Sequence, residues 1–229
     1  IVDSKPQYKY LVKNKIVNHK ANFFNSVSGI DLQSIKKNNF KKELFKKGYN
    51  IHKNSFGLIY VGRINHDKGI NDLIEIYLNL KKKLKNKIYL IIVGEDEINF
   101  FRQNLSSILK KNQIFYFQKS DNINYYLNLC DLFVTCSKRE GFCQSIIEAN
   151  AHGLPAIAYN LYNLSQTILD KKTGYLAENK SIFIKHILNL YYNRLLYNKF
   201  SRNCLRRCKF DFNQNIFIKK FRSILFENV

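Results

Sequence analysis

The sequence predicts an α/β protein in which a parallel sheet carries helices on both faces, with further helices at the C-terminal end. Three observations lead to this fold class. Short apolar runs alternate with stretches of helical periodicity between residues 56 and 159. The runs are apolar nearly throughout, as in strands that are buried on both faces. Glycine follows the first two runs and marks their turns. Strands that alternate with helices are typical of parallel sheets.

The first strand and helix show this pattern most clearly. Residues 57–61 form a β-branched and aromatic run that ends at Gly62. After a loop, apolar residues recur at helical spacing over residues 70–84. These apolar positions are Ile70, Leu73, Ile74, Tyr77 and Leu80. A strand, a turn and a helix are therefore expected.

The next elements repeat this unit. Residues 88–93 form the longest apolar run, which has the length of a strand and ends at Gly94. A helix is expected after it, around 98–109, as the strand–helix unit repeats. The run 114–117 is aromatic and β-branched, and a helix is expected after it, around 123–129.

The last predicted unit contains the loop that matters most for function. The apolar run 132–135 predicts a strand. A helix is expected at about 144–151, and Gly153 and Pro155 indicate where it ends. The remaining expected elements are a strand at 156–159 and three helices within 181–227.

Charge narrows the classes of partner. The chain has 38 Lys and Arg against 17 Asp and Glu, a net charge of +21. Such a charge suits nucleic acid or an anionic membrane. However, Lys, Asn, Ile and Tyr are all over-represented, as expected when an AT-rich genome biases codon use. Lysines of this origin mostly lie on solvent-exposed faces. Nucleic-acid-binding signatures are absent, so no nucleic-acid partner is expected, whereas a peripheral contact with an anionic membrane stays open.

Hydropathy and cysteine usage indicate the compartment. No run of about 18 uncharged apolar residues occurs, so no membrane-spanning helix is expected. Five Cys, an odd number, argue against a disulfide framework, and a reducing cytoplasm is expected. The chain begins at Ile1 and contains no Met, from which we expect a fragment whose N-terminal neighbour is missing.

The loop after the first strand carries the first candidate site. Gly62 and Arg63 end the strand, and Lys68 and Gly69 open the next helix. A guanidinium fork and an ammonium beside helix N–H groups form a polyphosphate site. The loop lacks the Walker and dinucleotide glycine patterns. By itself, the loop is better explained as two solvated cations in a Lys-rich protein.

The loop before the helix at 144–151 carries the second candidate site. Glu140 and Glu148 are separated by seven residues, one in the loop and one in the first turns of the helix. Ligands of parallel sheets bind at the carboxyl ends of the strands. Both carboxylates are therefore expected to face the same crevice as Arg63 and Lys68. A carboxylate accepts hydrogen bonds from vicinal hydroxyls, which suits a ribose or a hexose.

These two loops together resemble a known enzyme family. The run from Glu140 to Glu148 resembles the Glu-x7-Glu signature of retaining glycosyltransferases of family 4, also called glycosyl transferases group 1. The segment from Gly62 to Gly69 matches the upstream diphosphate-binding loop of that family. The similarity covers roughly residues 25–175, including the turn Ser28-Gly29-Ile30-Asp31, which looks like the family's inter-domain segment. The resemblance implies a Rossmann-like domain, the C-terminal donor-binding half of a GT-B enzyme.

The resemblance also implies a division of the chain into three regions. Residues 1–55 would be an inter-domain connector and a remnant of the N-terminal acceptor domain. Residues 56–209 would be the Rossmann-like domain that binds a nucleotide-sugar donor. Residues 210–229 would be the C-terminal helix that crosses back onto the missing N-terminal domain.

Site residues follow from the resemblance position by position. Arg63 and Lys68 would contact the diphosphate, Glu140 would hold sugar hydroxyls and Glu148 the ribose. Arg63, Lys68 and Glu140 would be the catalytic residues. The implied donor-binding residues are Gly62, Arg63, Lys68, Glu140, Gly141, Phe142, Cys143, Gln144, Ser145 and Glu148. No Asp-x-Asp run occurs, so neither a metal nor another cofactor is expected.

The implied function is retaining transfer of a hexose from a UDP- or GDP-sugar to a glycan or lipid-linked acceptor in cell-surface polysaccharide synthesis. The implied location is the cytoplasm, with a peripheral position on the inner face of the plasma membrane left open. The fragment is expected to be inactive alone. Two alternatives remain: a nucleotide-sugar epimerase of GT-B fold, and a non-catalytic basic binding module.

Some nearby residues receive other expectations. The family usually has glycine where Cys143 stands, and a Cβ there is costly if the backbone must approach the donor. Glu95-Asp96-Glu97 is interpreted as acidic residues at a helix start. His152 is expected to complement a helix C-terminus, and neither His152 nor His66 is expected to be catalytic.

Overall fold

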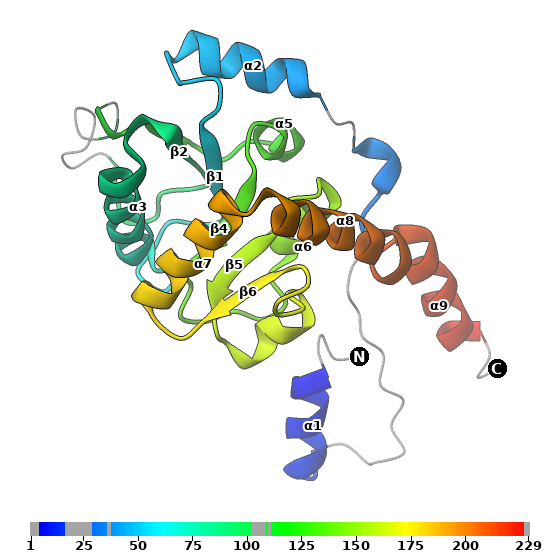
Figure 1. Ribbon diagram of the computed structural model, residues 1–229. Helices are drawn as coiled ribbons and strands as arrows, with labels where there is room; N and C mark the ends of the chain where they lie inside the picture. Colours follow the sequence, from blue (N-terminus) through cyan, green and yellow to red (C-terminus); the bar gives the residue numbers. More distant parts are fainter. Residues whose placement is uncertain (1–4, 17–28, 36–37, 102–108, 110, 227–229) are drawn as a thin grey trace.

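The computed structural model describes residues 5–16, 29–35, 38–101, 109 and 111–226. Within them, six parallel strands form one sheet in the order β3-β2-β1-β4-β5-β6 (Figure 1). The strands are β1 Phe56–Val61, β2 Ile88–Val93, β3 Ile114–Phe117, β4 Leu132–Thr135, β5 Ala156–Tyr159 and β6 Gly174–Ala177. The helices are α1 Lys5–Lys13, α2 Asn39–Gly48, α3 Ile70–Leu84, α5 Ile123–Asn128, α6 Gln144–Ala151, α7 Lys180–Tyr192, α8 Arg194–Asp211 and α9 Gln214–Phe226. Three short 3-10 helices are η1 Leu32–Ser34, η2 Lys85–Lys87 and η3 Tyr162–Gln166.

The fold class predicted from the sequence is confirmed. The two central strands pair in parallel register from Phe56↔Ile88 to Val61↔Val93. Every side chain of β2 is buried, which explains why its sequence is apolar without interruption. The helix expected around 98–109 lies largely outside the described residues.

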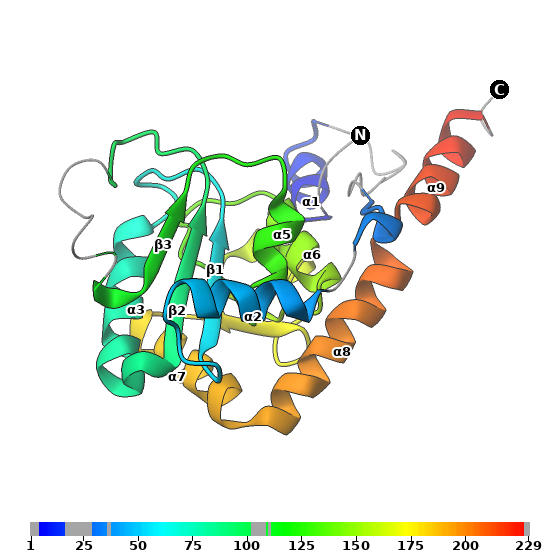
Figure 2. The same cartoon turned by 90° about the horizontal axis from the view of Figure 1, so that it is seen from above.

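The sheet separates two apolar cores. Side chains from α3 and α7 pack on one face, and those from α2, α5 and α6 pack on the other. Figures 1 and 2 show α3 and α7 on one side of the sheet and α5 and α6 on the other. The chain order reverses between β1 and β4, which are neighbours in the middle of the sheet. A crevice at the carboxyl ends of the strands is expected at such a switch point.

Helix α2 and strand β6 are two elements that the sequence analysis did not anticipate. Helix α2 falls within the segment that was expected to be a connector. Its Asn38 cap accepts a hydrogen bond from the Lys41 N–H at 3.1 Å, and Phe45 is buried against the rings of Tyr89 and Phe115. This helix therefore packs on the domain.

The three C-terminal helices are confirmed, and a segment from the N-terminal part of the chain packs at the junction of the last two. The Ile30 N–H donates to Phe212 O at 2.7 Å, and the Gln214 N–H donates to Ile30 O at 3.1 Å. A Cβ at Gly29 would lie 2.3 Å from the Gln214 Cα, so only glycine allows this approach. Both ribbon views show α9 extending away from the sheet beyond α8 (Figures 1 and 2).

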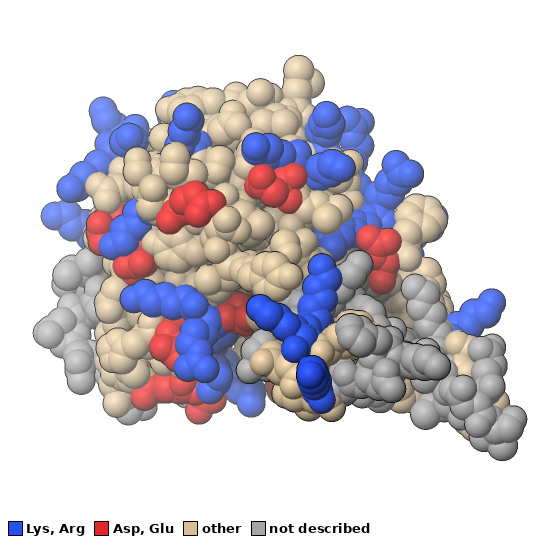
Figure 3. Space-filling view, turned by 90° about the horizontal axis from the view of Figure 1, so that it is seen from below, with Lys and Arg blue, Asp and Glu red and all other residues tan. Residues whose placement is uncertain are grey.

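The surface displays the charge excess that the sequence predicts. On the face seen in Figure 3, Lys and Arg lie in many separate groups, with Asp and Glu in smaller groups between them. Positive and negative side chains are thus interspersed on this face.

Candidate functional site

The loops after β1 and β4 meet at the switch point of the sheet. Gly69 has a φ of +67°, and a Cβ there would lie 2.0 Å from Cys136 O at the end of β4. The Lys138 N–H donates to Asp67 O at 2.8 Å. Glycine at position 69 is therefore required for the two loops to lie side by side.

The contact between these loops joins two of the predicted site residues. The Lys68 Nζ lies 2.7 Å from the Glu140 Oε1, although the two residues are 72 positions apart in the chain. Their side chains are only 20% and 10% exposed. The nearby Tyr60 of β1 donates its hydroxyl to Arg63 O at 2.6 Å. Burial, and to a smaller extent the negative charge of Glu140, raises the pKa of Tyr60 well above its usual value. The hydroxyl therefore keeps its proton.

Arg63 belongs to the same loop but pairs with the neighbouring loop after β2. Its Nη1 lies 2.9 Å from the Glu97 Oε1, while Asn65 donates to the Glu97 Oε2 at 2.7 Å. Both hydrogen bonds lower the pKa of Glu97, and the one from Asn65 has the larger effect. The Arg63 side chain is 64% exposed, so it is open to other partners.

Glu97 and Asn65 are therefore residues of this region that sequence reasoning missed. The acidic run was interpreted as a helix start, and Asp96 does accept hydrogen bonds from the Phe100 and Phe101 N–H groups, both at 2.9 Å. The signal that could have identified Glu97 is its position in the loop after β2, beside β1.

A pocket of about 580 Å³ opens beside the Lys68–Glu140 pair. Lys138, Arg139 and Tyr162 line it, together with Gly141. Asn163 holds the loop after β5 against this region, since its Nδ2 donates to Glu140 O at 3.0 Å. The Tyr162 ring is 68% exposed. We call this space the acidic-loop pocket, after its lining residue Glu140.

Glu148 lines a different pocket, of about 330 Å³, together with Gln144, Asp31 and His152. Burial raises the pKa of the Glu148 carboxyl above its usual value. The structure thus divides the predicted residues between two pockets, whereas the sequence analysis expected one crevice. The reason is geometric: Gln144 and Glu148 are one helical turn apart, and their common face of α6 points toward residues 29–35.

The residues between the two carboxylates are placed by the start of α6. Cys143 caps the helix with a left-handed backbone, φ +54° and ψ +74°, and its Sγ lies 3.5 Å from the Ser145 Oγ. Burial, and to a smaller extent the negative charge of Glu140, raises the pKa of the Cys143 thiol to about 11. The Phe142 ring packs edge-on against Phe212. Gly141 is exposed, and a Cβ there would meet nothing within 4 Å.

His152 occupies the helix end that was expected for it. It is the C-cap of α6, it is 2% exposed, and its Nδ1 lies 2.8 Å from Glu148 O. Among the described residues, no group of three or more His, Cys, Asp or Glu side chains is arranged to hold a metal ion. In the same part of the chain, none of the helices combines the length and hydropathy needed to cross a bilayer.

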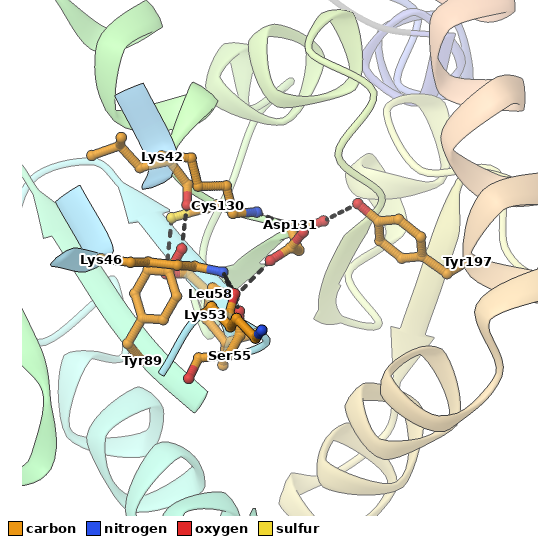
Figure 4. A network of polar contacts seen from close by, with 11 residues as sticks. Lys42, Lys46, Lys53, Ser55, Leu58, Tyr89, Cys130, Asp131 and Tyr197 are labelled. Carbon is orange, nitrogen blue, oxygen red and sulfur yellow. Dashed lines mark hydrogen bonds and ion pairs between the residues drawn. The ribbon is translucent and has the colours of Figure 1, made fainter. Parts of the chain in front are cut away.

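A second polar network lies at the opposite end of the sheet, where β1 and β4 begin (Figure 4). The Lys46 Nζ donates to the carbonyls of Lys53 and Ser55, each at 2.8 Å. Lys42 pairs with Asp131 at 2.7 Å, and the Tyr197 hydroxyl donates to Asp131 O at 3.0 Å. Because these contacts tie α2 and α8 to the strand starts, we interpret the network as structural.

Comparison with known proteins places this geometry in a family. The family model "Glycosyl transferases group 1" matches residues 41–207. The capsular polysaccharide biosynthesis glycosyltransferase CapM of Staphylococcus aureus is 32% identical over 163 residues, which are 68% of this chain and 40% of CapM. The chain spans 40 to 52% of the length of the first three curated relatives that it matches.

Solved structures share the fold. The C-terminal domain of a glycosyl transferase group 1 protein (LpcC) from Francisella tularensis superimposes with a TM-score of 0.67 at 23% identity, covering 81% of this chain and 99% of that domain. The Anabaena protein HepE, solved in complex with UDP and glucose, gives a TM-score of 0.75 at 16% identity, covering 86% of this chain and 55% of HepE. With the family model matching most of its length, the chain belongs to the glycosyl transferases group 1 family.

Proposed function

We propose that this chain binds the nucleotide-sugar donor of a retaining glycosyltransferase of family 4. The enzyme transfers a hexose from a UDP- or GDP-sugar to a glycan or lipid-linked acceptor in cell-surface polysaccharide synthesis. The observation that carries this proposal is the 2.7 Å contact between Lys68 and Glu140 at the switch point of the sheet. A cation that can bind phosphate and a carboxylate that can accept hydrogen bonds from hydroxyl groups lie side by side there. The names of CapM and of the UDP-bound HepE structure support the proposal.

The cations act on the leaving group. When the glycosidic bond to the donor breaks, the nucleoside diphosphate gains negative charge and the anomeric carbon becomes cationic. Arg63 and Lys68 stabilise the departing diphosphate, since fixed charges need no reorganisation during the reaction. The diphosphate replaces Glu97 as the partner of the exposed Arg63 guanidinium. The backbone of Gly62 lies next to this position.

The carboxylates bind hydroxyl groups. Glu140 accepts hydrogen bonds from the sugar, and Glu148 accepts them from the ribose. The segment Gly141-Phe142-Cys143-Gln144-Ser145 supplies N–H groups along the sugar and the diphosphate. The leaving phosphate takes the proton of the acceptor hydroxyl on the same face of the sugar. No protein base is then needed, and the configuration is retained.

The chain supplies one half of the whole enzyme. We assign residues 56–209 to donor binding and 210–229 to the crossing helix. Residues 1–55 are assigned to a connector with a remnant of the acceptor domain, except that α2 packs on the donor domain. The match to 99% of a C-terminal domain and to about half of the curated relatives supports this assignment. The acceptor then binds to an N-terminal domain, so the chain alone binds donor without transfer. The assembled enzyme works in the cytoplasm, peripherally on the inner face of the plasma membrane.

Calorimetric titration tests the proposal. We expect UDP or GDP to bind saturably, and Arg63→Ala and Lys68→Ala each to weaken that binding about tenfold or more, because each removes a charge-assisted contact. Glu148→Ala should weaken binding of the nucleotide itself. Glu140→Ala should keep nucleotide affinity but abolish the extra affinity of the sugar-bearing donor.

The matched control is Lys82→Ala, which removes an exposed cation from the last turn of α3. It should leave nucleotide affinity unchanged. Steeply salt-dependent binding of a control RNA, without any nucleotide preference, would instead identify a basic binding module. Equal losses of nucleotide affinity in the Glu140 and Glu148 variants would refute the division of roles.

A further inference from the structure

The acidic-loop pocket holds more positive charge than the proposed diphosphate contacts use. Lys68 and Glu140 form one close ion pair and neutralise each other. Lys138 and Arg139 line the same pocket. Its lining therefore carries two further cations next to the proposed sugar position.

These two cations have little compensation from the protein. Within the described part of the chain, Lys138 has no carboxylate within 4 Å, and Arg139 reaches only Asp67, at 3.9 Å. The Arg139 and Asp67 side chains are 83% and 65% exposed, so this pair contributes little. Asp72, a further carboxylate near Lys138, is already paired with Lys180 at 2.9 Å. An anion entering the pocket would thus meet cations that are free to bind it.

The backbone holds these cations in place. The Lys138 N–H bonds to Asp67 O at 2.8 Å, and Glu140, the next residue but one, is fixed through Lys68 and through Asn163. The backbone that carries these two consecutive cations is therefore fixed, which lowers the entropic cost of bringing them to an anion compared with lysines on a mobile segment.

The remaining wall suits a carbohydrate. Tyr162 presents an exposed ring to the pocket, and an aromatic ring offers an apolar surface with a polar tip. Glu140 is a hydrogen-bond acceptor for hydroxyls. Aromatic surface, hydroxyl acceptor and cations together fit a sugar that carries a negative group.

We propose that the sugar bound in the acidic-loop pocket is acidic, bearing a carboxylate or phosphate that Lys138 and Arg139 recognise. This inference rests on the proposed donor site and adds the chemical class of the sugar. Lys138 and Arg139 are then specificity residues, which do not contact the nucleotide.

The proposal is tested by titrating the 229-residue chain with UDP, UDP-glucose and UDP-glucuronate. If GDP binds better than UDP, the ligands are GDP, GDP-mannose and GDP-mannuronate. We expect the acidic donor to bind about threefold to tenfold tighter than the neutral one, as two partly exposed ion pairs provide. The double variant Lys138→Gln/Arg139→Gln should lose this preference and retain its affinity for the free nucleotide. The control variant Lys82→Gln/Lys83→Gln, with the same change of charge on exposed positions of α3, should retain the preference.

The outcomes separate the two proposals. If no nucleotide binds, the donor site and the acidic sugar both fail. If the nucleotides bind but the neutral and acidic donors bind equally, only the acidic sugar is refuted. If the control variant loses the preference as well, the effect is one of net charge and the assignment of Lys138 and Arg139 is wrong.

Discussion

At the scale of the residue, Cys143 shows a conflict between conformation and side chain. Its left-handed φ of +54° costs a residue with a Cβ about 1–2 kcal/mol. We expect Cys143→Gly to be more stable than Cys143→Ala by about 1 kcal/mol, the reverse of the usual order, because both lose the thiol but only glycine loses the strain. Urea unfolding of the two variants measures the difference. An alanine variant as stable as the glycine variant would show that the strain is absent.

Glu148 shows a cost of a different kind. Burial raises the pKa of its carboxyl, so the folded chain binds a proton more readily than the unfolded chain does. The contribution of this carboxyl to stability is therefore most favourable below its unfolded pKa, and it is lost as the pH rises through the folded pKa. We expect Glu148→Gln to melt at a higher temperature than the native chain at pH 7, with the gap closing toward pH 4. A gap that does not change with pH would contradict this origin.

At the scale of the element, the strands and the main helices are predictable because each carries its own signal. Five of the six strands and α6 lie where continuous apolar runs and the pair Gly153 and Pro155 indicate them. Helix α2 carries no such signal, since its exposed lysines hide the one buried aromatic side chain, Phe45. Strand β6 begins at Gly174, which fits closely against Ala156 O, and because glycine is depleted in strands the run Gly174–Ala177 carries a weaker strand signal.

The arrangement of the candidate site can be predicted from the sequence only in part. The contact of Lys68 with Glu140 is predictable, because loops after adjacent parallel strands meet. The pairing of Arg63 with Glu97 follows from the same rule, since β1 and β2 are also adjacent, but the acidic run was interpreted only as a helix start. The position of Glu148 depends on the rotation of α6 about its axis, which the apolar residues of so short a helix leave undetermined.

Helix α2 provides a test at this scale. Phe45 is 6% exposed, whereas Phe40 of the same helix is 65% exposed. We expect Phe45→Ala to lower the free energy of unfolding by about 3–5 kcal/mol and Phe40→Ala to change it by less than about 0.5 kcal/mol. Chemical denaturation followed by circular dichroism measures both. Equal, small effects would mean that α2 is only a connector.

At the scale of the whole molecule, the two ends of the sheet have different tasks. The carboxyl ends of the strands carry exposed or weakly paired cations and two pockets. The starts of the strands also border a pocket, of about 540 Å³, but polar groups that line it, such as Lys46 and Asp131, are bonded to other protein groups. Ligand binding is therefore expected to concentrate at one end, while the other end anchors α2 and α8.

The attachment of residues 29–31 beside the α8–α9 junction has a mechanical consequence. The path that enters the sheet domain and the path that leaves it are bonded to each other at Ile30, Phe212 and Gln214. A body linked through both paths would have two parallel tethers rather than one. Such a pair permits bending about a single axis and resists twisting, so an approaching partner would close on the domain along one direction.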